Sequence, residues 1–225
     1  VDGKPVNPRS GYIVEFNALW YNDIKFVAWL FSDTSETEYT AHLEEMASLC
    51  KDAFVATFLN NYGYLYDYVD GNMVDWSVRP NMILAAALDY SPLEQSQKKS
   101  VVDICTRELL TPKGLRSLSP KSGGYTPVCV GDQDHRNRVY HQGTAWPWLG
   151  GFYLEACLKL YKRTRLSFVE RQLIGYEDEV TSHCLGTIPE YFDGNPPYSG
   201  RGAISFAMNV GEVLRTLALL EKYKY

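Results

Sequence analysis

Stretches of helical periodicity alternate with long loops along this chain, and that alternation restricts the possible fold more than any other feature. Apolar residues recur three or four positions apart within each stretch, which is the spacing of one helix face. The stretches that show this spacing are 14–30, 36–60, 82–89, 92–109, 146–161, 167–184 and 203–223. Loops this long inside a compact domain are usually functional. We therefore predict an all-α fold of about seven helices, in which helical hairpins stack into a toroid and the functional residues lie in the loops.

The remaining segments are predicted to be loops rich in glycine, proline and aromatic residues. One of them is predicted to hold a short strand pair at 64–69 and 73–76, turned by Asp70-Gly71. The length of 225 residues fits one domain. Because about seven helices are too few to close a double ring of twelve, we expect residues 1–225 to be part of such a domain, with an upstream portion absent. The predicted loops are 1–13, 60–81, 111–140 and 185–202.

Composition and charge exclude several classes of function. Hydrophobic residues make up 45% of the chain, which supports a core, and the 17 tyrosines suit a wet, concave binding site. A net charge of −5 without any basic run argues against a nucleic-acid partner. No apolar run reaches the length of a membrane span, so we predict no membrane partner. The 5 cysteines are widely spaced and form no C-x-x-C pair, which favours a reducing compartment, the cytoplasm, over a disulfide framework or a zinc site.

The segment 140–149 reads YHQGTAWPWL and is the most informative stretch of ten residues. It sets His141 and Gln142 beside two tryptophans, Trp146 and Trp148. Flat aromatic faces next to amide and imidazole groups suit a sugar, whose C–H faces pack on indole and whose hydroxyls need donors and acceptors. The alternative is the start of an amphipathic helix that carries two core tryptophans.

The segment 187–194 reads TIPEYFDG and holds a carboxylate in an aromatic loop stiffened by proline. Hydrolysis of a glycosidic bond needs two carboxyl groups, which in an inverting enzyme lie about 6.5–9.5 Å apart. Glu190 is the best candidate for one of them, because Pro189, Tyr191 and Phe192 limit its solvation. Asp193 is an alternative base, although Asp-Gly is also typical of a turn.

Other polar residues in the predicted loops are candidates with structural alternatives. Asn81 precedes a helix and is also a candidate N-cap, and Arg116 is also a candidate for a surface ion pair. Residues 132–136 resemble a metal loop but lack the glycine and the distal glutamate of a calcium hand, so we predict a solvated or sugar-contacting loop. The nucleophile, phosphate-loop, dinucleotide and H-E-x-x-H motifs are missing. The candidates in loops are Asn17, Arg79, Asn81, Arg116, Asp132, Asp134, His135, Arg136, His141 and Gln142.

Five segments, in order along the chain, resemble motifs of the glycogen debranching enzymes. Residues 15–22 (EFNALWYN) resemble the family's VEINALWYNAL, and residues 79–81 (RPN) resemble RPNQ. Residues 110–118 (LTPKGLRSL) resemble LLTPxGLRTL, and residues 140–148 resemble YHQGTVWPW. Residues 187–194 resemble GxIxEIFDGD. The resemblance runs from about Gly3 to the C-terminus and is specific because five motifs keep their order.

The resemblance implies an α-glucosidase with an (α/α)6 toroid, of which this chain is the C-terminal part. Such an enzyme removes the single α-1,6-linked glucose left at a branch of glycogen or an α-glucan oligosaccharide, by inverting hydrolysis without metal or organic cofactor. By position, Glu190 matches the general base, and Asp193 lies in the same motif. The residues that match the glucose pocket are Asn17, Trp20, Arg79, Asn81, Arg116, His141, Gln142 and Trp146. Trp146 is expected to stack on the sugar, and His141, Gln142, Arg79 and Arg116 to hold its hydroxyls.

Two departures from the family pattern leave other functions open. The family's general acid lies in a WMDA segment that we align upstream of Val1, and Asp2 does not match it, so we expect the chain to be inactive alone. The family tail GxxAQAWSVAExLR differs from residues 202–215, where Phe206 replaces a glutamine and Met208 a tryptophan. The alternatives are a glycan-binding fragment without catalysis, or another toroid glycosidase that resembles trehalase or glucoamylase.

Overall fold

The computed structural model describes residues 3–183 and 185–225, so Asp2 and Cys184 lie outside the described part. The chain divides into two compact units, each of which is described by itself. One unit comprises the segment up to Pro8, Ser77–Pro80 and Asp103–Tyr225, and we call it the sheet unit. The other comprises Arg9–Trp76 and Asn81–Val102, and we call it the hairpin unit.

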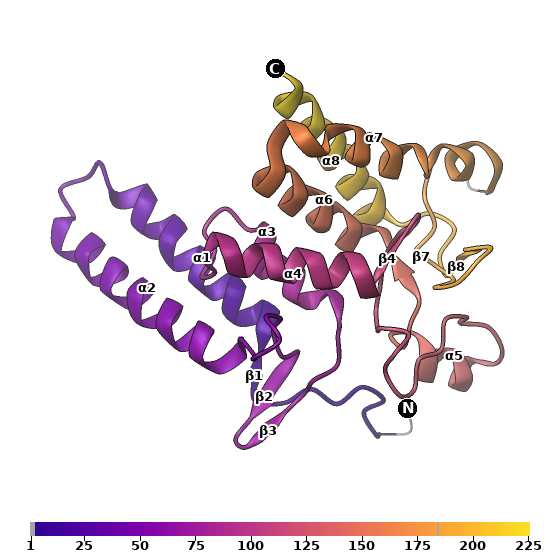
Figure 1. Cartoon of the computed structure of the whole chain (residues 1–225), viewed down its shortest axis with the longest axis horizontal. Helices are drawn as coiled ribbons and strands as arrows, with labels where there is room; N and C mark the ends of the chain where they lie inside the picture. Colours follow the sequence, from indigo (N-terminus) through magenta and orange to yellow (C-terminus); the bar gives the residue numbers. More distant parts are fainter. Residues whose placement is uncertain (1–2, 184) are drawn as a thin grey trace. The chain divides into compact units, whose positions relative to one another are not determined.

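The hairpin unit is built on two long helices, α1 (Val14–Phe31) and α2 (Thr37–Phe58), which pack along each other (Figure 1). Both were predicted from apolar periodicity, and the polar run 32–35 separates them as expected. Their shared core includes Tyr21, Ile24 and Leu43. Burial of such side chains stabilises each helix more than its intrinsic propensity does.

The hairpin unit also contains a three-stranded antiparallel sheet. Its strands are β1 (Tyr12–Ile13), β2 (Tyr68–Asp70) and β3 (Met73–Val74), in that order. The predicted strand pair is therefore present, with Val69 opposite Val74. Gly71, at φ +57°, allows the turn between the strands. The predicted helices 82–89 and 92–109 correspond to η1 (Pro80–Met82), α3 (Ile83–Ala87) and α4 (Gln95–Glu108), and the unit boundary falls within α4.

The helices of the sheet unit are α6 (Pro147–Tyr161), α7 (Leu166–Ile174) and α8 (Ala207–Lys224), with a 3₁₀ turn η2 (Lys162–Arg165) after α6. Proline at the first position of α6 starts this helix, as expected. Helix α8 packs closely on α6 at Gly151, where a Cβ atom would lie 3.1 Å from Glu212 Cβ. The helical class that the sequence predicts is therefore confirmed.

The prediction of one continuous helix over 167–184 is wrong. Helix α7 ends at Ile174, and a separate π-helix, η3, spans Glu179–His183. Gly175 lies at the break, where a Cβ atom would come within 2.9 Å of Pro112 O. The carbonyl of Gly175 accepts a hydrogen bond from Lys113 Nζ (2.6 Å). The helix ends here because its backbone contacts a loop that is distant in sequence.

The prediction that 111–140 and 185–202 are plain loops is also wrong. They contribute to a five-stranded antiparallel sheet of β4 (Leu110–Thr111), β5 (Gly114–Arg116), β6 (Ala145–Trp146), β7 (Tyr191–Phe192) and β8 (Gly200–Arg201). A short helix, α5 (Gln133–Val139), also lies within 111–140. Two or three residues are too few to show the alternating pattern by which strands are predicted.

Candidate active site

The sheet of the sheet unit brings the two informative segments of the sequence together. Strand β6 pairs with β7, with Ala145 opposite Phe192. Both residues are fully buried and share a hydrophobic cluster with Tyr176 and Ile188. The segment 140–146 therefore lies beside β7, and Glu190, which directly precedes β7, contacts Tyr140.

Glu190 is half-buried and is held by hydrogen bonds to both carboxylate oxygens. Tyr140 Oη donates to Oε1, and the backbone N–H of Ala203 donates to Oε2 (2.9 Å). The carboxylate lines a cavity of about 290 Å³, close to the smallest pockets that bind small molecules, about 300 Å³. The other residues that line this cavity are Gln133, Arg136, Asn137, Tyr140, Tyr191, Gly202 and Ala203.

Tyr140 and Tyr191, which line this cavity, belong to a cluster of aromatic rings. The ring of Tyr140 lies 5.0 Å from that of Trp146 and 5.2 Å from that of Tyr191, in both cases edge to face. His141 stacks on Trp146 at 5.4 Å. Trp146 is only 5% exposed, and its indole N–H donates to Thr144 Oγ1 (2.9 Å). Trp146 thus supports the other rings, and little of its own surface is open to a ligand.

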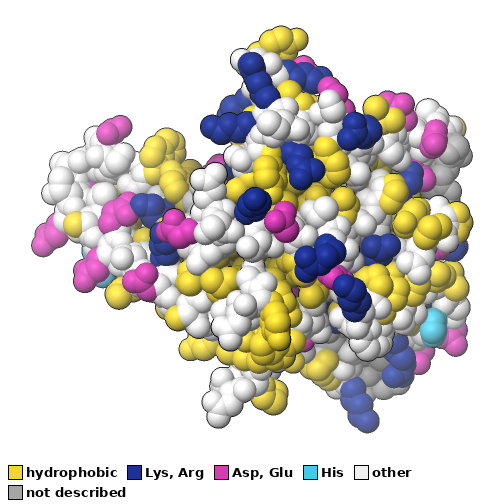
Figure 2. All heavy atoms as spheres, viewed as in Figure 1, with side chains coloured by type: hydrophobic (Ala, Val, Ile, Leu, Met, Phe, Trp, Pro, Cys, Tyr) yellow, Lys and Arg dark blue, Asp and Glu magenta, His cyan; other side chains and the backbone are white. Residues whose placement is uncertain are grey.

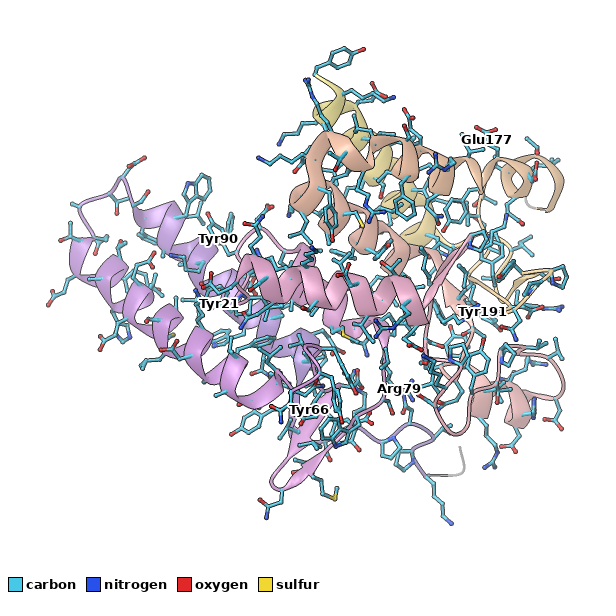
Figure 3. The ribbon with its side chains drawn as sticks, viewed as in Figure 1. Tyr21, Tyr66, Arg79, Tyr90, Glu177 and Tyr191 are labelled. Carbon is cyan, nitrogen blue, oxygen red and sulfur yellow. The ribbon has the colours of Figure 1, made fainter. Side chains whose placement is uncertain are left out.

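Arg79 is buried and organises the backbone of the His141–Gln142 segment. Its Nη1 donates to the carbonyl oxygens of His141 (2.8 Å) and Ser117 (3.1 Å). Its Nη2 donates to Gln142 Oε1 (3.1 Å), which fixes the orientation of that amide. Figure 3 shows Arg79, from the segment before η1, and Tyr191, from β7. Arg79 therefore shapes the loop that carries the predicted sugar-binding groups.

Arg116 and Asp193 have comparable roles around the turn that follows β7. Arg116 Nε donates to Gly194 O (2.8 Å), and Nη1 donates to Leu110 O (3.2 Å). Asp193 is buried, and both of its oxygens accept from Arg201, at 3.1 Å and 2.8 Å. This ion pair raises the pKa of Arg201, chiefly through the hydrogen bond. Because its carboxylate is engaged, Asp193 is a weaker candidate than Glu190 for activating water.

His141 offers its imidazole at an exposed position beside the cluster. Partial burial of the ring lowers its pKa below the usual range, and the charge of Arg79 lowers it further. The ring is therefore neutral at pH 7, with one nitrogen that donates and one that accepts. A neutral imidazole is suited to hydrogen bonds with sugar hydroxyls.

Three predicted site residues belong to the hairpin unit. Asn17 and Trp20 line a separate cavity of about 240 Å³ together with Phe54 and Phe58. Trp20 is 55% exposed, while Asn17 Nδ2 donates to Ile13 O (2.8 Å). Asn81 Nδ2 donates to Asp67 Oδ1 (2.8 Å), and the buried Asp67 also pairs with Arg9.

A family model described as amylo-alpha-1,6-glucosidase matches residues 1–215. The chain belongs to this family. A curated relative, the glycogen debranching enzyme of Saccharomyces cerevisiae, is 27% identical over 190 residues. That match covers 68% of this chain but only 12% of the relative. The resemblance inferred from the motifs is thereby confirmed.

Solved structures of glycosidases share the fold. Neutral trehalase Nth1 from Saccharomyces cerevisiae has a TM-score of 0.66 at 16% identity, covering 92% of this chain and 37% of that one. The GH63 mannosylglycerate hydrolase from Thermus thermophilus in complex with glucose has a TM-score of 0.62 at 16% identity, covering 93% and 47%. A sialidase has a TM-score of 0.72 at 14% identity, covering 93% and 20%. The predicted fold class, that of the (α/α)6 toroid, is confirmed.

Sequence reasoning did not select several residues that surround Glu190 in this member of the amylo-alpha-1,6-glucosidase family. Gln133 and Asn137 come from α5, inside the predicted loop 111–140, as does Arg136, which was among the candidates. Asp132 is the N-cap of that helix, since its side chain accepts from His135 N (2.8 Å). An aspartate before a helical turn is a usable sequence signal. Tyr140 directly precedes His141, and it was not predicted as a site residue either.

Two further features of the family member concern metals and membranes. Among the described residues, no group of three or more His, Cys, Asp or Glu side chains is placed to hold a metal ion. None of the helices in the described part of the chain is both long and apolar enough to cross a membrane.

An apolar groove of about 530 Å³ lies elsewhere in the sheet unit, along α7 and α8. Its lining includes Leu173, Val213 and Leu217, and none of the predicted site residues. Figure 2 shows hydrophobic side chains exposed among charged ones on one face of the molecule. The lining is mostly apolar and holds neither Glu190 nor the residues around it, so this groove is not the candidate site.

Proposed function

We propose that this chain carries the base of an enzyme that hydrolyses α-1,6-glucosidic branch linkages in glycogen or limit dextrin with inversion. Membership of the amylo-alpha-1,6-glucosidase family supports the substrate class. The observation that carries the proposal is the Glu190 carboxylate, held by two donors in a cavity with polar and aromatic walls. The activity is a property proposed for the full-length protein, because the chain spans only 12% of its curated relative.

The proposed chemistry assigns one role to Glu190. A water oxygen bonds to C1 of the terminal glucose while the bond from C1 to the leaving oxygen breaks. Glu190 takes a proton from that water, and a second carboxyl group on the opposite face gives a proton to the leaving oxygen. A carboxylate has about four lone-pair positions, so Glu190 can accept this proton while both of its present hydrogen bonds persist.

The geometry of the sheet unit supports the proposed glucose contacts. His141 and Gln142 hold hydroxyls directly, while Arg79 and Arg116 act by fixing the backbone around them. Trp146 stacks on His141 and so supports that ring. Asn17, Trp20 and Asn81 of the hairpin unit match the family's motifs, and we propose that they too bind the glucan.

The test is Glu190→Gln in the full-length protein, with Glu177→Gln as a control that removes an exposed carboxylate outside the site. We expect kcat for glucose release from limit dextrin to fall about 10²–10⁴-fold in Glu190→Gln, the usual contribution of a general base, with an unchanged melting temperature. The control retains its activity. Wild-type turnover by Glu190→Gln refutes the assignment.

Product analysis separates the alternatives. Inversion predicts that β-glucose appears first, which NMR detects before mutarotation. Preferred hydrolysis of trehalose or maltose by the wild type favours a trehalase-like or glucoamylase-like enzyme. Binding of limit dextrin without release of glucose favours a glycan-binding protein.

We also propose the cytoplasm as the location of the protein. Cys105, Cys129 and Cys157 are buried free thiols, and Cys50 is a half-buried one. Free thiols persist where disulfides are kept reduced. Burial raises the pKa of Cys157 to about 11, which keeps it protonated and unreactive. Thiol trapping in intact cells tests the proposal, and recovery of these cysteines as disulfides contradicts it.

A further inference from the structure

We propose that Tyr140 is a positioning residue for the Glu190 carboxylate, and that the Gly202-Ala203 turn positions the other oxygen of the same carboxylate. The inference rests on the proposed role of Glu190 as the base, and it explains what keeps that base aimed into its cavity. Tyr140 and Ala203 each donate to a different oxygen of the carboxylate.

Three aromatic rings pack against the ring of Tyr140 and restrict its orientation. His141 lies 4.4 Å away between ring centroids, Trp146 5.0 Å and Tyr191 5.2 Å. The backbone of Tyr140 is fixed as well, since its carbonyl accepts from Thr144 Oγ1 (2.7 Å). Edge-to-face ring pairs of this kind add stability beyond their buried area. This packing holds the Tyr140 ring where its hydroxyl donates to Glu190.

The hydrogen bond from Ala203 to Glu190 depends on a glycine. Gly202 has φ +72°, in the left-handed region that favours glycine. A Cβ atom there would lie 2.9 Å from Glu190 Cβ and 2.7 Å from the Tyr191 ring, and would also contact Glu190 Oε2. The backbone N–H of Glu190 donates to Ala203 O (2.9 Å), which locks the two segments together. Only glycine lets the turn approach closely enough for the Ala203 amide to reach the carboxylate.

Two donors, one on each oxygen, fix the rotation of the carboxylate and leave a lone pair on each oxygen for the reacting water. Tyr140 keeps its own proton, because burial and, next, its hydrogen bond to Glu190 raise its pKa above the usual range. Arg136, the cation beside this cavity, is engaged through Nη1 with Gly131 O and through Nη2 with Gln133 Oε1 (2.7 Å). Tyr140 and Ala203 thus orient the base without themselves transferring a proton.

The first test measures whether the charge of Glu190 raises the pKa of the Tyr140 phenol, and it needs no turnover. Tyrosine labelled with ¹³C at Cζ is titrated by NMR in the chain, and the Tyr140 signal is assigned from its loss in Tyr140→Phe. We expect a titration midpoint above the ordinary value of about 10 in the wild type, and a lower midpoint in Glu190→Gln. An equal midpoint in both proteins overturns the proposed contact.

The second test separates positioning from the proposed function by kinetics in the full-length protein. Tyr140→Phe keeps the ring and loses the donor, and we expect kcat to fall about 10–100-fold with little change in KM, as for a misplaced catalytic group. Tyr161→Phe is the control, because it removes a phenol that donates to another carboxylate, Asp103 (3.4 Å). If Glu190→Gln is inactive while Tyr140→Phe equals the wild type, the positioning proposal fails alone. If Glu190→Gln is active, the proposed function fails, and the positioning role fails with it.

The third test addresses the glycine. Gly202→Ala and Gly124→Ala share the strain of a left-handed φ, at +72° and +83°. A Cβ atom at Gly124 has no heavy atom within 4 Å, so this variant measures the strain alone. We expect Gly202→Ala to lower kcat at least tenfold more than Gly124→Ala does. Equal effects of the two substitutions overturn the role of the Gly202-Ala203 turn.

Discussion

Replacement of Arg79 by lysine is expected to destabilise the sheet unit, because the guanidinium group makes, besides a long hydrogen bond to Asn7 Oδ1 (3.4 Å), three shorter ones at once. These are His141 O at 2.8 Å, Ser117 O at 3.1 Å and Gln142 Oε1 at 3.1 Å. Lysine carries its charge at a single point and cannot reproduce the planar fork of arginine. It therefore retains about one of the three bonds.

The size of the effect follows from that count. A hydrogen bond to a charged group contributes about 1.5–3 kcal/mol, so the loss of two corresponds to about 3–6 kcal/mol. The lower end applies where water replaces the lost donor. A domain has a total stability of about 5–15 kcal/mol, so Arg79→Lys removes a large share of it.

Urea denaturation measures this difference, with Arg138→Lys as the control. Arg138 is exposed on α5 and pairs with Asp134 one helical turn away, and an exposed pair of this kind contributes little to stability. We expect a much lower denaturation midpoint for Arg79→Lys than for the control, with an unchanged slope. If the two variants differ by less than about 0.5 kcal/mol, the three contacts do not hold the loop and the reasoning is refuted.

Two further predictions concern Asp193 and His141. Asp193→Asn loses the ion pair with Arg201, so we expect urea denaturation to show a free energy of unfolding about 1–3 kcal/mol lower. We expect kcat to stay within tenfold of the wild type. A loss of kcat as large as that of Glu190→Gln would assign the role of base to Asp193. The folded-state pKa of His141 lies below the ordinary value of about 6.5, so the unfolded chain binds more protons as the pH falls through that value. Stability is therefore fully present above about pH 6.5 and declines below it. Denaturation at pH 5 and pH 8 tests this, and a decline that persists unchanged in His141→Gln, with His42→Gln as control, contradicts it.

Much of the helical framework was predictable from sequence because it depends on local periodicity. The α1–α2 hairpin follows from apolar spacing and a polar break, and the β2–β3 turn follows from Asp70-Gly71. The break at Gly175 was not predictable, because it results from contacts with Lys113 and Pro112, more than sixty positions away. The strands of the five-stranded sheet are too short to leave a pattern, and the pairings of β5 with β6 and of β6 with β7 join segments that are distant in sequence.

The candidate site shows the same division. The importance of segments 140–149 and 187–194 was evident from their side-chain chemistry, and the β6–β7 pairing places them together. The burial of Trp146 and the use of Arg79 as a backbone ligand were not evident, because residue type does not reveal which side of a loop a side chain faces. The roles of Asn17, Trp20 and Asn81 stay predictions.

The brevity of β7 and β8 has a consequence for how this protein can change over evolution. Pairing of Tyr191 with Arg201 and Phe192 with Gly200 anchors the segment around Glu190, whereas Pro196 and Pro197 lie exposed at the tip between the two strands. Lengthening a flexible tip is thermodynamically inexpensive, at roughly 0.6 kcal/mol for each doubling. The tip near Pro196 can therefore take up insertions while the paired strands keep the Glu190 carboxylate in its place.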